Sequence, residues 1–221
     1  MEVSLRHIIP FLVFTLFTRV LIAQDNVIEE ESYTKSIELT NGGWDSFAKG
    51  EYDQAIGLFT EALKIYDGNT DTWLGRATAY SQKEQYDLAK DDVDKAIQLS
   101  PSEADVYYLG GNVLMKSKLY HKAALYYSRA IEYNPTSNVK VNVEDCYYNR
   151  GNAYLMTEKL EMAVADFTAY IESNLDNPAG YHNRGVAFKK LGIEDKACAD
   201  FKAALDHGSD KSARYMSSYC K

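Results

Sequence analysis

The sequence lacks the excess of basic side chains that a nucleic-acid surface needs. It has 24 lysines and arginines against 32 aspartates and glutamates, which gives a formal net charge of −8 at pH 7. Binding to nucleic acid depends on a basic stripe that neutralises phosphates, so we expect no nucleic-acid partner. An acidic balance of this size mostly serves solubility.

Residues that carry catalytic chemistry are also scarce. The sequence has no phosphate-binding glycine-rich loop and no serine in a nucleophile-elbow context. No two of the four histidines have metal-ligand spacing: His7, His121, His182 and His207. Cys146 with His182 is a conceivable nucleophile and base, but a cysteine within a packed helix is more often a small apolar filler. The carboxylates Asp91, Asp92 and Asp94 are interpreted as solvated surface charge. We therefore expect no enzyme, no metal site and no cofactor.

A full membrane-spanning run is missing as well. A span needs about 20 apolar residues, whereas Pro10 and Arg19 interrupt the apolar stretch between residues 8 and 23. A basic start, an apolar middle and a small-residue exit predict a secretory signal peptide at 1–23, cleaved after Ala23. An uncleaved membrane anchor remains the alternative, because Leu21 stands where a signal peptidase prefers a small residue. Residues 24–35 are predicted to form an acidic N-terminal lead that becomes helical near Ser32.

The sequence is rich in repetition. Between Thr70 and Pro135, seven residues are followed 34 positions later by the same or a similar side chain. The first set is Trp73, Tyr80, Tyr86, Ala89, Ala96, Ile97 and Pro101, and the second is Tyr107, Leu114, Tyr120, Ala123, Ala130, Ile131 and Pro135. A fixed period of this length indicates an array of supersecondary units.

This pattern resembles the tetratricopeptide repeat, a helix-turn-helix unit that stacks with its neighbours. The resemblance implies an all-α solenoid, a right-handed superhelix of about five repeats with a C-terminal capping helix. The period places the repeats at 36–69, 70–103, 104–137, 144–177 and 178–211, and the capping helix at 212–221. Residues 138–143 interrupt the period. We expect a longer loop or an extra helical turn there, with a dedicated binding loop as the alternative.

Small residues recur where the two helices of each repeat should cross. They are Gly43, Ala77, Gly111, Gly151 and Gly185 on the first helices, and Ala55, Ala89, Ala123, Ala163 and Ala197 on the second. Large side chains at these places would hold the helices apart. Aromatic residues of the second helices are expected to fill the remaining space: Phe59, Tyr127, Phe167 and Phe201.

The C-terminal end carries two of the three cysteines, Cys198 and Cys220. Their surroundings are similar to the C-terminal ends of many exported bacterial tetratricopeptide proteins, which implies a diderm bacterial source and a periplasmic or envelope location. An antiparallel return of the last helix brings the two Cα atoms within the roughly 4.4–6.8 Å of a disulfide. We predict this disulfide, with two unpaired core cysteines as the alternative, and we expect Cys146 to remain a buried thiol.

The resemblance also implies a binding surface on the concave face, lined by fixed positions of each first helix. Here these positions hold Leu74, Thr78, Tyr108, Asn112, Met115, Lys116, Tyr148, Asn152, Met156, His182, Val186 and Lys189. Asn112 and Asn152 share one repeat position, and we expect their amides to bind the backbone of an extended peptide between the walls of Tyr108 and Tyr148. The lysine of the family's carboxylate clamp is absent, so we predict no chaperone-tail binding.

Two functions from different classes follow. The first is a scaffold that holds a peptide or helix of an envelope protein in its concave groove, which the resemblance implies. The second is a structural subunit of an outer-membrane or secretion complex that packs through its convex face or its ends. Membrane association is expected only if the N-terminal segment is uncleaved. An exposed apolar patch outside the groove would favour the second function.

Overall fold

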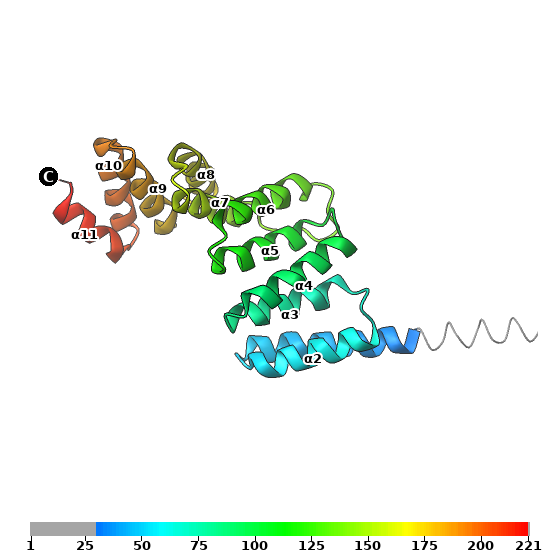
Figure 1. Ribbon diagram of the computed structural model, residues 1–221. Helices are drawn as coiled ribbons and strands as arrows, with labels where there is room; N and C mark the ends of the chain where they lie inside the picture. Colours follow the sequence, from blue (N-terminus) through cyan, green and yellow to red (C-terminus); the bar gives the residue numbers. More distant parts are fainter. Residues whose placement is uncertain (1–29, 221) are drawn as a thin grey trace, which may run out of the picture.

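The computed structural model describes residues 30–220, and within this range all regular structure is helical (Figure 1). Residues 30–48 form the first helix. The others are α2 (Tyr52–Ile65), α3 (Thr70–Gln82), α4 (Tyr86–Leu99), α5 (Ala104–Lys116), α6 (Tyr120–Tyr133), α7 (Val143–Met156), α8 (Leu160–Ser173), α9 (Pro178–Lys190), α10 (Glu194–Asp206) and α11 (Asp210–Ser218). The predicted signal peptide at 1–23 lies outside the described residues.

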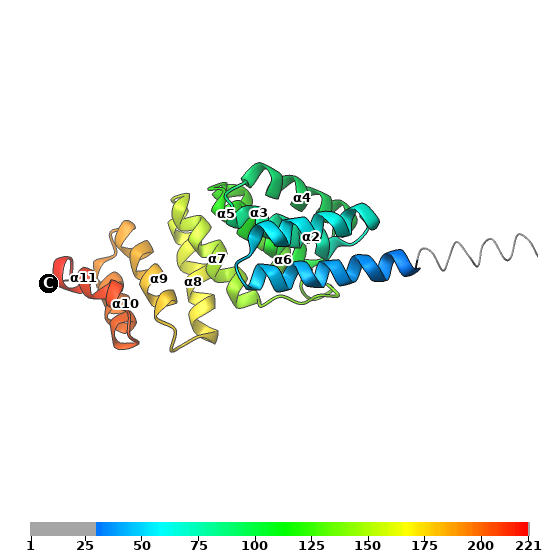
Figure 2. The same cartoon turned by 90° about the horizontal axis from the view of Figure 1, so that it is seen from below.

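The helices pack as successive hairpins, α3 with α4, α5 with α6, α7 with α8 and α9 with α10, in a bent array (Figures 1 and 2). The first helices of these hairpins begin at Thr70, Ala104, Val143 and Pro178. Helix α11 packs on α10 and ends the array. The predicted solenoid of about five repeats with a terminal helix is therefore confirmed.

The turn inside each repeat has one backbone form. A residue with positive φ ends the first helix of every repeat: Gly50, Glu84, Lys118, Glu158 and Gly192, with φ of 80°, 60°, 59°, 58° and 74°. The next residue then donates its N–H back across the helix end, as Lys159 does to the Tyr154 carbonyl at 2.9 Å. This left-handed cap suits glycine. A residue with a side chain there costs about 1–2 kcal/mol.

Where the two helices of a repeat cross, a small residue on the first helix makes room for a larger side chain on the second. A Cβ on Gly111 would lie 2.7 Å from the Tyr127 ring, and one on Gly151 would lie 2.8 Å from the ring of Phe167. Gly43 and Gly185 meet Phe59 and Phe201 in the same way. In the second repeat the ring position holds a smaller valine, Val93, and the small residue is Ala77, which is fully buried. The predicted role of the small residues is confirmed: glycine stands where an aromatic ring faces the first helix, and the alanines of the set are fully buried.

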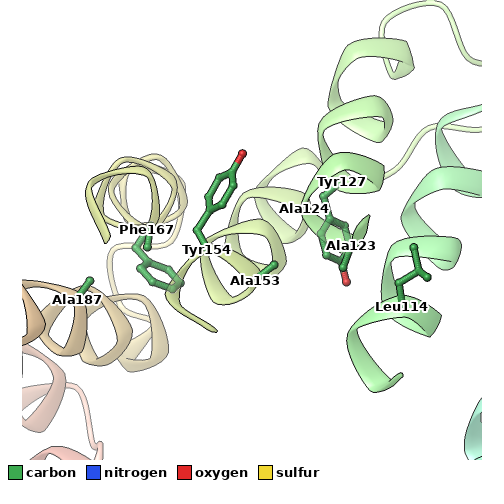
Figure 3. Close-up of a cluster of buried hydrophobic side chains, with 9 residues drawn as sticks. Leu114, Ala123, Ala124, Tyr127, Ala153, Tyr154, Phe167 and Ala187 are labelled. Carbon is green, nitrogen blue, oxygen red and sulfur yellow. The ribbon is translucent and has the colours of Figure 1, made fainter. Parts of the chain in front are cut away.

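The core is continuous from one repeat to the next. Figure 3 shows part of a cluster that runs from Leu114 of the third repeat through Tyr127 and Phe167 to Ala187 of the fifth. Each unit therefore buries apolar surface against its neighbours as well as within itself, as expected of a solenoid.

Both ends of the array are formed by helices. The first helix begins at residue 30, within the acidic lead and close to the start expected near Ser32. The helix extends this far because Tyr33 packs edge-on against Tyr66 with ring centroids 5.3 Å apart, and the buried Ser36 hydroxyl donates to the Ala62 carbonyl at 3.2 Å. At the other end, α11 begins at Asp210 after its N-cap residue Ser209.

The insertion between repeats 3 and 4 forms an ordered loop. Glu103, at the N-cap of α5, accepts hydrogen bonds from the Ser137 hydroxyl at 2.6 Å and from the Asn138 N–H at 2.8 Å. The Asn142 side chain then caps α7 by accepting from the Glu144 N–H at 2.9 Å. The hydrogen bonds that Glu103 accepts, above all the one from Ser137, lower the pKa of Glu103 below its ordinary value. The loop is thus held to the preceding repeat by the Glu103 carboxylate and also by Asn134, whose Oδ1 accepts from the Val141 N–H at 2.8 Å.

The C-terminal cysteines are joined. Cys198 of α10 and Cys220, just beyond α11, form a disulfide with a Cα–Cα distance of 5.5 Å. Cys146 is a free and fully buried thiol. The disulfide ties the capping helix to the last repeat.

Candidate binding groove

The inner side of the array is formed by the first helix of each repeat. Successive first helices touch one another, α3 with α5, α5 with α7 and α7 with α9, whereas successive second helices make at most marginal contact. A bent stack brings together the helices on its inside and spreads those on its outside. The surface of α3, α5, α7 and α9 that faces away from the second helices is called the groove below.

The groove does not include all predicted residues. Leu74 is only 1% exposed and packs with Ala96 and Val106, so its predicted role as a groove residue is wrong. Its apolar side chain is buried between the second and third repeats. Tyr108 and Tyr148, at the same position of later repeats, are half-buried because each ring leans on an aromatic ring of its own second helix, Tyr127 at 6.2 Å and Phe167 at 6.0 Å.

Two pairs of amides cross the groove from one repeat to the next. Asn112 accepts a hydrogen bond through Oδ1 from the Tyr127 hydroxyl at 2.8 Å and a longer one from Asn149 Nδ2 at 3.4 Å. Asn152 accepts through Oδ1 from Asn183 Nδ2 at 2.8 Å. The oxygens of Asn112 and Asn152 are therefore engaged within the protein. The Asn112 amide also hydrogen-bonds the Tyr108 hydroxyl, whereas the Asn152 Nδ2 group has no acceptor among residues 30–220 and is left for a partner.

The remaining predicted residues differ in how accessible they are. Thr78 is half-buried and its hydroxyl donates to the Leu74 carbonyl at 2.7 Å. Met115 packs against the core and Val186 is half-buried. The two most accessible residues are Lys116, which donates to Gln82 at 2.7 Å, and Met156, which is 56% exposed.

The C-terminal end of the groove meets the capping helix. His182 Nδ1 lies 2.8 Å from the buried Ser212 hydroxyl of α11, and Lys189 Nζ lies 4.8 Å from the centre of the Tyr215 ring. Burial, with a smaller contribution from Lys211, lowers the pKa of His182 below its ordinary value. His182 is therefore a neutral hydrogen-bonding side chain near pH 7.

Three bidentate ion pairs were not expected from the sequence. Arg150 bonds Asp166 through Nε at 2.8 Å and Nη2 at 2.7 Å, and its Nη1 reaches Ser128 of the preceding repeat at 3.0 Å. Arg76 with Asp92 and Arg184 with Asp200 repeat this arrangement. The interpretation of Asp92 as surface charge is therefore wrong. Its position between Ala89 and Ala96 on the buried face of α4 carried the signal.

Burial sets the charge behaviour of these pairs. Desolvation raises the pKa of Asp166 above its ordinary value, against the opposing pull of Arg150. The third repeat has no such pair, because Gly110 and Tyr126 occupy the corresponding positions and a Cβ on Gly110 would lie 3.0 Å from the Tyr126 ring. Each pair joins the two helices of one repeat, and the Nη1 group of each arginine reaches a hydroxyl of the preceding repeat.

Cys146 and His182, the candidate nucleophile and base, are each engaged elsewhere. Cys146 is fully buried, and burial raises the pKa of its thiol to about 12, which keeps it protonated and unreactive. His182 bonds Ser212 instead. The described residues contain no group of His, Cys, Asp and Glu suited to a metal ion. Across the described part of the chain, none of the helices has the length and apolar character needed to cross a membrane.

Comparison with known proteins agrees with this architecture. Family models described as tetratricopeptide repeat match residues 46–109, 104–137 and 144–177, together more than half of the chain. A curated relative, small glutamine-rich tetratricopeptide repeat-containing protein 2 of Mycosarcoma maydis, is 27% identical over 110 residues, which cover 50% of this chain and 31% of that protein. The chain thus spans about a third of that relative's length.

Two solved structures show the same fold. YrrB, described as a TPR protein with an unusual peptide-binding site, has a TM-score of 0.70 at 24% identity and covers 87% of this chain and 96% of its own. MamA has a TM-score of 0.66 at 25% identity and covers 78% of this chain and 97% of its own. The similarity extends over most of the array.

Proposed function

Because the chain belongs to the tetratricopeptide repeat family, we propose that it is a protein–protein interaction scaffold whose groove holds a peptide or helix of a partner protein. It acts by binding and not by catalysis. The partner is a protein of the bacterial envelope, which follows from the proposed export of this chain. Protein–protein interaction is the common role of the family, and the groove chemistry supports its assignment here.

The observation that carries this proposal is the amide of Asn152. Its oxygen accepts a hydrogen bond from Asn183, which fixes the orientation of the amide, and its Nδ2 group has no acceptor among residues 30–220. An extended peptide presents backbone carbonyls at regular spacing, and the Asn152 Nδ2 group can donate to one of them. The half-buried rings of Tyr108 and Tyr148 supply apolar walls. The structural neighbour YrrB, described as a TPR protein with an unusual peptide-binding site, is a precedent within the same fold.

A second function is favoured by the outer surface. The second helices expose large apolar side chains, including Leu88 of α4, Leu125 of α6 and Met162 of α8. Apolar residues on the outside of an array suit packing against a larger assembly. The chain would then be a structural subunit of an outer-membrane or secretion complex, and the groove would be incidental.

Matched charge variants separate the two functions. Lys116→Glu with Met156→Glu places two acids on exposed positions of the first helices, and Lys122→Glu with Met162→Glu makes the same chemical change on the second helices. Each purified variant is used to capture partners from the envelope fraction of the native host, with circular dichroism as the fold control. We expect the groove variant to lose the captured protein and the outer variant to keep it. The reverse result assigns the partner to the outer surface and contradicts the groove.

Export is part of the proposal and has its own test. The apolar segment before Ala23 supports a cleaved secretory signal and a periplasmic or envelope location. Intact-mass measurement of protein from the native host should give a chain that begins at or near Gln24. A mass that still includes Met1 would replace the cleaved signal with an N-terminal membrane anchor.

A further inference from the structure

A cavity of about 600 Å³ lies at the C-terminal end of the groove, between α9 and α11. Its wall carries three basic side chains, Lys189 from α9 and Lys211 and Arg214 from α11, with Tyr215 beside them. One acidic residue, Asp210, also lines it. This cavity is called the basic pocket below.

The charge of the basic pocket is opposite to that of the chain, which has a formal net charge of −8. Lys189, Lys211 and Arg214 have no carboxylate within 4.0 Å among residues 30–220. What sets them apart from other exposed lysines without an ion pair is that all three line one pocket. Three cations without a carboxylate partner on one concave wall form a site for an anionic group.

The wall is held in place before any ligand arrives. The disulfide between Cys198 and Cys220 ties down the end of α11. Tyr215 stacks on Phe201 with ring centroids 4.4 Å apart, and Lys189 Nζ lies over its ring at 4.8 Å. Because these contacts fix α11 against α9 and α10, binding costs little ordering of the backbone.

We propose that the basic pocket binds an acidic peptide segment, with its carboxylates on Lys189, Lys211 and Arg214 and an apolar side chain against Tyr215. This proposal rests on the groove function above and names the chemistry of the partner. The pocket is continuous with the groove through His182 and Lys189, which belong to the first helix of the fifth repeat. An anionic membrane is disfavoured, because its flat surface cannot enter a concave site and is repelled by an acidic chain.

Fluorescence anisotropy with synthetic peptides tests the proposal on the full chain with its disulfide intact. The probe is a short labelled peptide rich in glutamate and leucine, compared with the same peptide in which glutamine replaces every glutamate. The variant Lys211→Ala with Arg214→Ala removes two exposed charges from the pocket. The control, Lys95→Ala with Lys202→Ala, removes two exposed charges from second helices.

We expect the acidic peptide to bind at least about tenfold more tightly than its glutamine counterpart, since each charge-assisted hydrogen bond is worth about that factor. The pocket variant should lose about tenfold in affinity and the control should keep it. Equal binding of both peptides, or equal loss in both variants, overturns the proposal. The proposal is also overturned if the acidic peptide does not bind and the chain instead binds phosphatidylglycerol vesicles through Lys211 and Arg214.

The outcome is separable from that of the groove itself. If the acidic peptide fails to bind but envelope capture is still abolished by Lys116→Glu with Met156→Glu, the groove function stands and the basic pocket is not its acidic subsite. If capture survives the groove variant, the groove function itself is wrong.

Discussion

Removing the carboxylate of one buried ion pair should destabilise the array locally and strongly. Asp166→Ala leaves the Arg150 guanidinium without two hydrogen bonds of 2.7 and 2.8 Å. The two side chains are only 18% and 7% exposed, so water replaces the lost partner poorly. Breaking a buried pair from one side costs about 3–5 kcal/mol. Arg150 also bonds Ser128 at 3.0 Å, so the damage should reach the third repeat.

The third repeat suggests a variant that restores stability. There the two positions of the pair hold Gly110 and Tyr126, and the Tyr126 ring packs against Tyr107 with centroids 5.6 Å apart. The double variant Arg150→Gly with Asp166→Tyr transplants this solution into the fourth repeat. It removes both charges and fills the space with a ring, which is often neutral relative to a buried pair. The new glycine within α7 should cost about 1 kcal/mol.

Urea unfolding followed by circular dichroism measures these free energies, and hydrogen exchange locates them. We expect Asp166→Ala to lose about 3–5 kcal/mol, with faster exchange concentrated in α7 and α8 because repeats interact with nearest neighbours. The double variant should recover at least about half of that loss. Asp53→Ala, which removes an exposed pair with Lys83, should cost about 1 kcal/mol or less. The reasoning is refuted if Asp166→Ala costs no more than Asp53→Ala, or if the double variant is less stable than the single one.

Three further predictions concern the turns, the C-terminal end and the loop. Lys118→Gly should raise the free energy of unfolding by about 1 kcal/mol, because Lys118 has a φ of 59°. Gly192→Ala should lower the free energy of unfolding, and thermal unfolding of both variants checks the direction of each change. Reducing the disulfide, which closes a separation of 22 residues, should weaken the C-terminal end by about 3 kcal/mol, and unchanged exchange in α11 would contradict this. The lowered pKa of Glu103 means that its stabilising bonds are complete above its unfolded pKa of about 4.3 and are lost as pH falls through the folded value. The protection of the Asn138 amide relative to its intrinsic exchange rate should therefore fall below that range, and Glu103→Ala should remove this pH dependence.

The repeat architecture could be predicted because its signals are local and periodic. A 34-residue period locates the hairpins. A glycine that is followed by an aromatic residue 16 positions later, as Gly151 is by Phe167, marks the place where the two helices of a repeat cross. The return of the last helix places Cys198 and Cys220 within reach of each other.

The side-chain details of the site depend on contacts between repeats, which a repeat position alone does not determine. Leu74 and Tyr108 share one position, yet the leucine is buried by Val106 of the next repeat while the longer tyrosine reaches the surface. Predicting the amide pairs would also have required the contacts between repeats. The run Tyr-x-Asn-Arg-Gly occurs at 147–151 and again at 181–185, which is a sequence signal for a shared role of Asn149 and Asn183.

The basic pocket depends on how α11 is placed. Lys211 and Arg214 are exposed residues of α11. Their meeting with Lys189 follows from the way α11 packs on α10 and is bound by the disulfide. No sequence period describes a terminal helix, so this juxtaposition was not predictable.

The central claim is that the partner lies in the groove, and site-specific photocrosslinking tests it most directly. A photoreactive amino acid replaces either Met156 of α7 or Leu125 of α6, two positions that are 56% and 54% exposed. Each form is expressed in the native host and irradiated, and the crosslinked species are identified by mass spectrometry. The groove account predicts one specific partner crosslinked from position 156 and none from position 125. A specific crosslink from position 125 alone contradicts it.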